Sequence, residues 1–228
     1  MAKSTLRVCI IGARGRMGQA VAAAAERIPE ITITAQVDCG DSMAAGMSGC
    51  DVAIDFSAAD AAEEICRAAL QYRRPLVIGT TGHSPEQRKT IQNAAASLPI
   101  VLASNFSVGV NALFWLTGKA ARLLGKNFST EIVETHHVTK KDAPSGTAKT
   151  LAEILKKETA ESEIAIRSIR EGEVVGEHTV IFSGPGERLE LIHRAQSRVN
   201  FATGALAAAK WVVDQPPGLY SMQNVLGL

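Results

Sequence analysis

The fold of the first half of the chain is decided by the stretch Leu6-Arg7-Val8-Cys9-Ile10-Ile11-Gly12-Ala13-Arg14-Gly15-Arg16-Met17-Gly18. Its apolar start is typical of a buried parallel strand, and its glycines follow the spacing G-x-x-G-x-x-G. The alanine-rich residues 16–28 predict a helix that stops before Pro29, and residues 31–37 predict a second strand that ends at Asp38. The stretch therefore opens a strand–helix–strand unit.

This unit has the chemistry of a dinucleotide site. Glycines let the backbone turn sharply and approach a pyrophosphate, and the start of the following helix offers unpaired N–H groups. Asp38, twenty residues after Gly18, is placed to accept hydrogen bonds from a ribose diol. The spacing is not the stricter G-x-G-x-x-G, so a turn whose glycines only permit close helix–sheet packing remains the alternative.

The strand–helix alternation continues through the first half. Residues 51–56, 76–78 and 100–103 predict strands, and residues 58–70 predict a helix, as does a segment opened by Ser84 as N-cap and Pro85 at the first helical position. Such a pattern indicates a doubly wound parallel sheet, which binds ligands beyond the carboxyl ends of its strands. Those ends carry small or polar residues that would line a cofactor groove, with an ordinary turn role as the alternative for each: Asp38, Phe56, Ser57, Gly79, Thr80, Thr81, Ser104, Asn105 and Phe106.

The pattern changes after residue 107. Residues 110–124 predict a helix with Trp115 on its buried face, and residues 164–169 alternate like a half-buried strand. Residues 178–183 and 188–193 flank a Gly-Pro-Gly turn, which predicts a hairpin. We therefore expect an α/β protein with an N-terminal Rossmann-type doubly wound parallel sheet and a C-terminal α+β domain carrying an open mixed sheet. A helix over residues 201–213 would return the chain to the first domain, so the expected domains are residues 1–107 plus 200–228 and residues 108–199.

Residues 134–147 gather two histidines, two lysines, a turn and a helix start between a strand and a helix. Proton donors, cations and free backbone N–H groups in one loop suit a small dianion that must be held and protonated; a solvated basic loop is the alternative. Ser145 is either the helix N-cap or a ligand, and Lys141 is either solvated or a steering charge. His83, His178 and His193 are expected to be isolated from this loop and structural.

Composition narrows the classes of partner and compartment. The 228 residues carry a formal net charge of +1, and 46% are hydrophobic, as in an ordinary globular protein without bulk attraction for nucleic acid or membranes. The four cysteines lack metal-ligand spacing, so no metal is expected and a reducing compartment is favoured. Neither a signal-peptide core nor a membrane-length apolar run is present, so we expect a cytoplasmic protein.

The motifs of the chain resemble, nearly end to end, those of the 4-hydroxy-tetrahydrodipicolinate reductase (dihydrodipicolinate reductase) family. The most specific is the loop that ends Asp142-Ala143-Pro144-Ser145-Gly146-Thr147; the glycine motif alone occurs in many dehydrogenases. The resemblance also rests on residues 12–18, 55–57, 79–82, 105–111, 220–222 and 224–226.

The resemblance implies NAD(P)H-dependent reduction of 4-hydroxy-tetrahydrodipicolinate to tetrahydrodipicolinate, in lysine biosynthesis via diaminopimelate. It implies that His136 is a proton donor and acceptor and Lys140 a second proton donor, and that His137, Gly146 and Thr147 bind a substrate carboxylate, with Ser145 beside them. It implies a usually homotetrameric, cytoplasmic enzyme that binds a small dicarboxylate and assembles through its second domain. The residues expected to contact the nicotinamide cofactor are Gly12, Ala13, Arg14, Gly15, Arg16, Met17, Asp38, Gly79, Thr80, Thr81, Ala103, Ser104, Asn105 and Phe106.

Two departures from the family concern the cofactor. The chain is shorter than typical members between Asp38 and Asp51, and Cys39 stands where the family often has a basic residue. A 2′-phosphate would then face Asp38, which predicts a preference for NADH; Arg14 with Arg16 offers another phosphate contact, so use of NADPH stays open. The rival functions are a dehydrogenase acting on an amino acid or a semialdehyde, and a non-catalytic nucleotide sensor.

Overall fold

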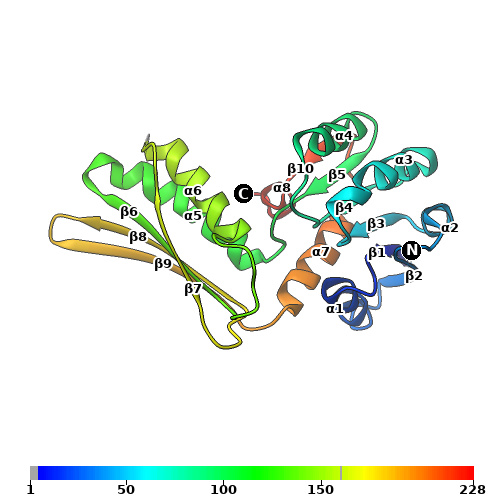
Figure 1. The fold of residues 1–228 in the computed structure, drawn as a ribbon. Coiled ribbons are helices and arrows are strands. Elements are labelled where there is room, and N and C mark those ends of the chain that lie inside the picture. The colour runs from blue at the N-terminus through cyan, green and yellow to red at the C-terminus, as the bar shows by residue number, and fades with distance from the viewer. Residues whose placement is uncertain (1–4, 160) are drawn as a thin grey trace. The chain divides into compact units, whose positions relative to one another are not determined.

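The computed structural model describes residues 5–159 and 161–228. The chain forms two compact units, the first from Met1–Phe106 with Val199–Leu228 and the second from Ser107–Arg198. Each unit has a sheet of its own (Figure 1). Among the described residues, no helix has the length and apolar character needed to cross a membrane.

The first unit is built on a six-stranded sheet in the order β10-β5-β4-β3-β1-β2, with every pairing parallel. The strands are β1 (Leu6–Ile11), β2 (Ile31–Val37), β3 (Val52–Asp55), β4 (Leu76–Ile78), β5 (Pro99–Leu102) and β10 (Gly218–Tyr220). The first five occur where the apolar runs predicted them, whereas β10 follows Pro216 and Pro217 and was not expected. Its three residues are too few to show a periodic pattern.

Helices cover both faces of this sheet because the strands bury side chains on both sides. In β1, Val8 and Ile10 enter one core, which the helices α1 (Arg16–Ala25), α7 (Val199–Val212) and α8 (Met222–Leu226) complete. Cys9 and Ile11 enter the other core, which α2 (Met43–Ser48), α3 (Ala62–Tyr72, after the 3₁₀ turn η1, Ala59–Ala61) and α4 (Pro85–Ala95) complete. The doubly wound parallel sheet is confirmed.

Two helix ends in this unit show how local chemistry sets the boundaries. Helix α4 begins as predicted, with Ser84 accepting a hydrogen bond from Gln87 N and the Gln87 side chain accepting one from Ser84 N. Helix α1 ends at Ala25, before the predicted boundary at residue 28. The segment before Pro29 closes with short-range turns, since Arg27 N and Ile28 N bond to carbonyls three residues back.

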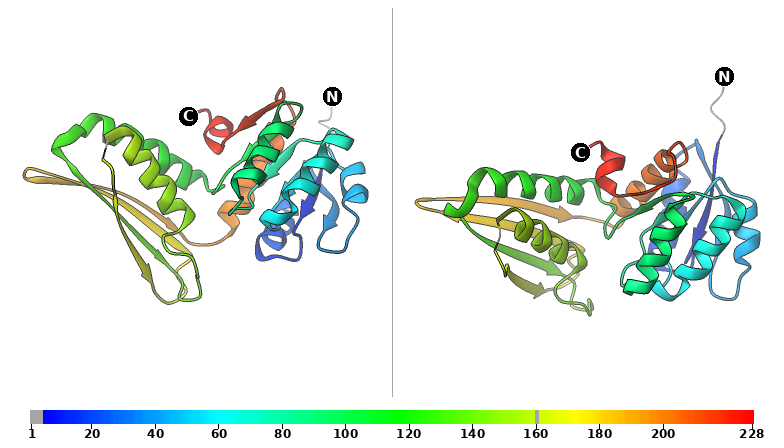
Figure 2. Two further views of the ribbon diagram at one scale, coloured as in Figure 1. Left: turned by 45° about the horizontal axis from the view of Figure 1, so that its top comes forward. Right: turned by 90° about the horizontal axis from the view of Figure 1, so that it is seen from above.

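The second unit is a four-stranded mixed sheet in the order β7-β6-β8-β9. It contains β6 (Ser129–His136), β7 (Ala165–Arg170), β8 (Gly176–Gly184) and β9 (Glu187–Ala195), with α5 (Val108–Leu124), the 3₁₀ turn η2 (Gly125–Asn127) and α6 (Gly146–Thr159). Strand β7 pairs parallel to β6, while β8 pairs antiparallel to β6 and β9, which confirms the hairpin and the mixed sheet. Figure 2 shows α5 and α6 on one face of this sheet; among the described residues no helix lies on the other.

The covered face changes character along β6. Thr130, Ile132, Glu134 and His136 alternate toward the helices and are all buried. Around Ile132 the contacts are apolar, but Glu134 and His136 continue the same row into a polar environment at the end of the strand. The end of β6 is therefore a buried polar site built into the edge of an apolar core.

Trp115 lies outside that core, contrary to expectation. Its exposed fraction is 37%, and the Lys119 ammonium lies 5.1 Å from its ring centroid. The buried row of α5 instead runs through Val110, Leu113, Phe114, Thr117 and Ala121. Trp115 follows Phe114 and is rotated away from that row by the 3.6-residue period of the helix.

Candidate active site

The glycine turn of the first unit brings the backbones of Gly12, Gly18 and Phe56 so close together that Gly12 and Gly18 have no room for a side chain. Gly12 has φ of +77°, and a Cβ placed on it would lie 2.5 Å from the carbonyl oxygen of Phe56. A Cβ on Gly18 would lie 2.3 Å from the carbonyl oxygen of Gly12. Both positions therefore require glycine, for the positive φ in one case and for close packing in both.

The start of α1 is open to an anion. Gly15 occupies the N-cap position without a side-chain cap, and the first turn contains no acidic residue. The N–H groups of a first helical turn have no partners within the helix and favour a bound phosphate. The glycine turn and the uncapped first turn of α1 thus fit the pyrophosphate of a dinucleotide.

Asp38 is held at the tip of β2 by backbone donors. Its carboxylate accepts hydrogen bonds from Arg14 N at 2.7 Å and Cys39 N at 3.1 Å. The bond from Arg14 N, followed by that from Cys39 N, holds the pKa of Asp38 below its usual range. The side chain is therefore an anionic acceptor, as binding of a ribose diol requires.

A cavity of about 620 Å³ lies beside the glycine turn and brings together five of the predicted cofactor residues, Gly12, Gly15, Asp38, Phe56 and Ser57. Its wall also contains acids that the sequence did not single out, Asp41, Asp60 and Glu64, and no basic residue. Asp41 accepts hydrogen bonds from Asp38 N at 2.9 Å and from Arg14 Nη2 at 3.3 Å. The guanidinium of Arg14 is thus already paired with a carboxylate.

The other predicted cofactor residues do not line this cavity. Ala13 belongs to the glycine turn, and Arg16 and Met17 open α1. A Cβ on Gly79 would lie 2.1 Å from the ring of Phe56, and the rings of Phe56 and Phe106 are 5.8 Å apart edge to face. The remaining predicted residues follow the carboxyl ends of β4 and β5: Thr80, Thr81, Ala103, Ser104 and Asn105.

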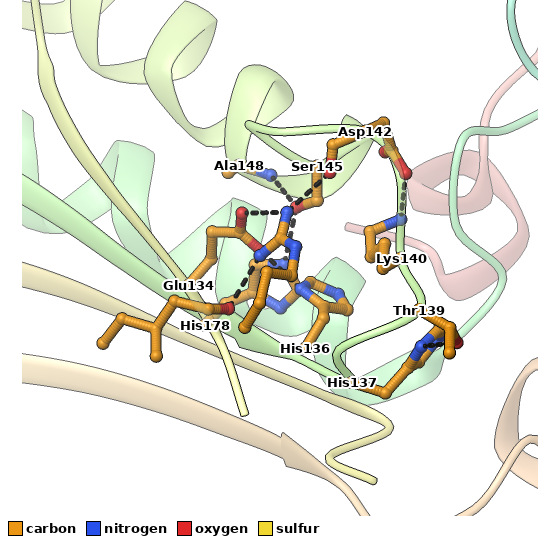
Figure 3. A network of polar contacts seen from close by, with 11 residues as sticks. Glu134, His136, His137, Thr139, Lys140, Asp142, Ser145, Ala148 and His178 are labelled. Carbon is orange, nitrogen blue, oxygen red and sulfur yellow. Dashed lines mark hydrogen bonds and ion pairs between the residues drawn. The ribbon is translucent and has the colours of Figure 1, made fainter. Parts of the chain in front are cut away.

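The predicted catalytic loop of the second unit surrounds His136, the last residue of β6 (Figure 3). The Nδ1 atom of His136 makes a short hydrogen bond with Glu134 Oε2, and the other carboxylate oxygen accepts a hydrogen bond from Arg170 Nη2 at 2.9 Å. Glu134 has no exposed surface. A buried carboxylate therefore fixes one side of the imidazole and leaves Nε2 for other contacts.

Opposing influences set the charges of this pair. Burial lowers the pKa of His136, as do the cations of Lys140 and Arg170, against the opposite effect of Glu134. Burial would raise the pKa of Glu134, but hydrogen bonds from Arg170 and Ser168 and the charge of His136 bring it below its usual range. Glu134 is therefore ionised, and His136 gives up its proton more readily than an exposed histidine.

The other basic residues of the loop are oriented by their neighbours. Lys140 Nζ pairs with Asp142 Oδ1 at 2.7 Å and has a side chain that is 22% exposed. His137 Nδ1 lies 2.7 Å from Thr139 Oγ1. Lys141 is exposed. Lys140 thus lies within the polar cluster while keeping contact with solvent.

Ser145 connects the start of α6 to the sheet. Its hydroxyl accepts a hydrogen bond from Ala148 N at 3.2 Å and lies 3.1 Å from Nε2 of His178. The cap interpretation of Ser145 is thus supported. Gly146, which is exposed, and Thr147, which is buried, form the first turn of α6 beside it, where backbone N–H groups favour a carboxylate.

The prediction that His178 is isolated from this loop was wrong. Its ring lies edge to face with that of His136, with centroids 5.1 Å apart. Burial, then the charge of His136, lowers the pKa of His178 to about 3, so its ring is neutral. His178 lies opposite Glu134 in the β6–β8 pairing, a register that the sequence did not reveal. By contrast, His193 contacts Ser107 Oγ at 3.4 Å, and His83 belongs to the first unit.

Glu134, His178 and Arg170 are thus site residues that sequence reasoning missed. A signal existed for Glu134, which alternates with Ile132 and His136 on the buried face of β6. Ligand atoms of Glu134, His136 and His178 lie within 4.8 Å of one another, a spacing that a metal ion would accept. The carboxylate is already engaged by His136 and by the cationic Arg170, which favours an ion-pair network over a cation site.

Comparisons with known proteins agree with this two-part architecture. Residues 6–106 match the family model described as "Dihydrodipicolinate reductase, N-terminus", and residues 109–226 match "Dihydrodipicolinate reductase, C-terminus". A 4-hydroxy-tetrahydrodipicolinate reductase of Akkermansia muciniphila is 47% identical over 242 residues, which cover 98% of each chain. The enzyme of the same name from Syntrophus aciditrophicus is 40% identical and covers 97% of this chain and 98% of its own.

A solved structure shares the whole architecture. Dipicolinate-bound dihydrodipicolinate reductase from Paenisporosarcina sp. TG-14 superposes with a TM-score of 0.79 at 25% identity, over 96% of this chain and 99% of the other. Diaminopimelate dehydrogenase of C. glutamicum, at 12% identity and a TM-score of 0.62, shares the fold alone. With both halves of the chain matched and relatives this similar along its length, the chain belongs to the dihydrodipicolinate reductase family.

Proposed function

We propose that this protein reduces 4-hydroxy-tetrahydrodipicolinate, through its dehydrated cyclic imine, to tetrahydrodipicolinate with NAD(P)H, in lysine biosynthesis via diaminopimelate. The observation that carries the proposal is the cluster of His136, Lys140 and the start of α6 in a chain whose two halves both match the family. The two relatives named above are 4-hydroxy-tetrahydrodipicolinate reductases, and their similarity to this chain extends over nearly its whole length.

The cluster suits the electron demand of this reaction. The substrate is a ring with two carboxylates and an imine, and the bound nicotinamide supplies the hydride, which goes to a carbon conjugated to that imine. The ring nitrogen then gains electron density and must receive a proton. A preorganised cation beside the nitrogen stabilises the transition state. Lys140 provides that cation and a proton, and His136 Nε2 handles a proton at the same site.

The substrate carboxylates meet N–H donors and a histidine. The backbone N–H groups of Gly146 and Thr147 grip one carboxylate at the start of α6, and His137 approaches from the loop. Ser145 supports this grip as the helix cap, tied to the sheet through His178.

NADH is the preferred reductant in this proposal, with NADPH as a weaker alternative. Asp38 accepts hydrogen bonds from the 2′- and 3′-hydroxyls of a ribose, whereas a 2′-phosphate would meet its negative charge. The acids Asp41, Asp60 and Glu64 add to that repulsion, and Arg14 is engaged by Asp41. Residues 38–41 therefore support discrimination against the phosphorylated cofactor.

We propose further that the protein works as a cytoplasmic homotetramer. The support is the face of the β7-β6-β8-β9 sheet that no helix of the described chain covers. That face presents the exposed side chain of Ile192, whose partner across the strands is Thr179. Burying such a face against another copy removes apolar surface from water. Sedimentation of the purified protein tests this assembly.

The decisive experiment is an assay with freshly generated cyclic imine and each reduced cofactor, applied to wild-type protein and to His136→Ala and Lys140→Ala. Each variant is expected to fold and to lose about 10²–10⁴-fold in kcat, the usual range for a positioned proton-transfer group. Lys141→Ala, a neighbouring exposed lysine, is the matched control and should keep its turnover. Near-normal rates in the first two variants would refute the proton-transfer roles of His136 and Lys140. Turnover only with amino acids or semialdehydes would refute the proposed substrate.

A further inference from the structure

Arg170 occupies a central position beneath the proposed active site. It is the last residue of β7 and the register partner of His136 in β6. Its guanidinium donates from Nη2 to Glu134 Oε1 at 2.9 Å and to the carbonyl oxygen of Asp142 at 2.5 Å, and from Nη1 to the carbonyl oxygen of Ile169 at 2.8 Å. One side chain therefore joins the sheet to the loop over residues 137–145.

The first of these contacts leads to His136. Arg170 holds one oxygen of the buried Glu134 carboxylate, and the other oxygen bonds His136 Nδ1. A carboxylate at Nδ1 fixes the tautomer and orientation of an imidazole, so that Nε2 faces the reacting group. Nε2 lies on the side of Gly176, where an added Cβ would come within 3.1 Å of it. The ring of His136 therefore has little room for another orientation.

The second contact leads to Lys140. Arg170 holds the main chain of Asp142, whose carboxylate pairs with Lys140 Nζ at 2.7 Å. The backbone around this loop is also tied to the end of β7, since Glu171 N bonds the carbonyl oxygen of His136 and Val138 N bonds that of Gly172. The position of the lysine thus depends on the same guanidinium.

We propose that Arg170 is a positioning residue that sets both proton-handling groups of the site together, His136 through Glu134 and Lys140 through Asp142. This inference rests on the proposed function, because it assigns Arg170 a role in that reaction. The competing interpretation is that Arg170 only neutralises a buried carboxylate and contributes to folding.

The two interpretations differ in what they predict for a lysine at position 170, which keeps the charge but cannot reproduce the contacts of the guanidinium to both Glu134 and Asp142. The charge of Arg170 lowers the pKa of His136, and its hydrogen bond holds Glu134 in place. Without the guanidinium, an uncompensated Glu134 carboxylate would face His136 alone and favour its protonated form. Neutralisation alone therefore predicts that Arg170→Lys recovers the full kcat of the wild type, whereas positioning predicts that it recovers only part of it.

The test compares Arg170→Met and Arg170→Lys with the control Arg122→Met. Arg122 is an arginine of the same unit that also pairs with a glutamate, Glu158, but on the surface of α5 and α6. Folding is followed by thermal unfolding and circular dichroism, binding by calorimetry with dipicolinate, and activity by kcat, KM and the pH profile of kcat/KM.

We expect Arg170→Met to lower kcat by about 10- to 100-fold, the range for residues that hold a functional side chain in its orientation, with a smaller change in KM. The limb of the pH profile assigned to His136 should move toward higher pH, and Arg170→Lys should restore part of kcat. Arg122→Met should retain both the rate and the profile of the wild type.

A folded Arg170→Met enzyme with kcat within about twofold of wild type and an unmoved pH limb would overturn the inference, since removal of a general acid or base orienter costs far more than that. If Arg170→Met does not fold, kcat of Arg170→Lys decides instead: a wild-type kcat overturns the inference, and a lowered kcat with little change in KM supports it. Failure of the proposed function is distinguishable, because it appears as absence of imine turnover in the wild-type enzyme.

Discussion

Replacing His178 by glutamine should reduce the loss of folding stability that the second unit suffers when the pH falls. In the folded chain the ring is buried, 3% exposed, with its pKa lowered from an ordinary 6.5 to about 3. His178 of the unfolded chain therefore binds a proton below about pH 6.5, whereas His178 of the folded chain does not bind one until the pH falls to about 3. Stability from this group is present above the ordinary pKa, and it is lost as the pH falls between those two values.

The magnitude follows from the linkage between protonation and folding. Each pH unit within that window changes the free energy of unfolding by about 1.4 kcal/mol, and the effect begins near the ordinary pKa. Between pH 7 and pH 5 the wild-type protein should lose about 2 kcal/mol through His178. Glutamine cannot titrate, so the variant should lose about 2 kcal/mol less over the same interval.

Tryptophan fluorescence allows the assay to report on one unit. The chain has two tryptophans, Trp115 in α5 and Trp211 in α7. In a Trp211→Phe background, Trp115 is the single indole and follows the second unit. Urea titrations at pH 7 and pH 5 give the free energy of unfolding of the parent, of His178→Gln and of His137→Gln, which controls for loss of a histidine as such.

Parallel losses of stability in the parent and in His178→Gln would refute the reasoning. They would mean that the folded unit accepts a proton on His178 as readily as the unfolded chain does. In that case water, or a rearrangement of Ser145, would have to solvate the imidazolium in place of the buried contacts seen here.

Three further predictions concern the catalytic loop of the second unit and the cofactor residues of the first. Gly176→Ala should push against Nε2 of His136, 3.1 Å from the added Cβ, and lower kcat about tenfold while leaving NADH affinity unchanged, as steady-state kinetics and a fluorescence titration can show. Asp38→Ala should weaken NADH about 10- to 100-fold by loss of charge-assisted hydrogen bonds and weaken NADPH less, so equal losses in titrations of the two cofactors would contradict the ribose role. Gly12→Ala would place a side chain at a positive φ, with its Cβ 2.5 Å from the Phe56 carbonyl oxygen. It should lower the free energy of unfolding of the first unit by about 1–3 kcal/mol and abolish measurable NADH binding. Urea unfolding followed by Trp211 fluorescence in a Trp115→Phe background measures the change in stability.

Much of the first unit was predictable because its signals are local. Buried parallel strands need continuous apolar runs, and each run is bounded by residues that cannot continue it, such as Pro29 or the glycines after Ile11. The helix start at Ser84 was equally readable, since capping depends on neighbours three residues apart. The short elements α2 and β10 escaped prediction because six and three residues are too few to display a period.

The acids of the cofactor cavity show where local reasoning stops. Asp38 was predictable from its place at the end of a strand after the glycine turn. Asp60 and Glu64 lie on η1 and α3, and only the winding of the chain across the sheet brings them to the same cavity. The contribution to cofactor preference that we propose for them is therefore a property of the folded unit.

The sequence by itself determined the two kinds of sheet, the glycine turn, Asp38, and a loop in which His136, Lys140 and a helix start stand within a few residues of one another. Only the tertiary structure decided which side chains would support that loop. Glu134, Arg170 and His178 come from three strands, and they meet because of the β6–β7 and β6–β8 registers. A shift of one residue would turn each of these side chains to the opposite face, and nothing within a single strand specifies its register against another.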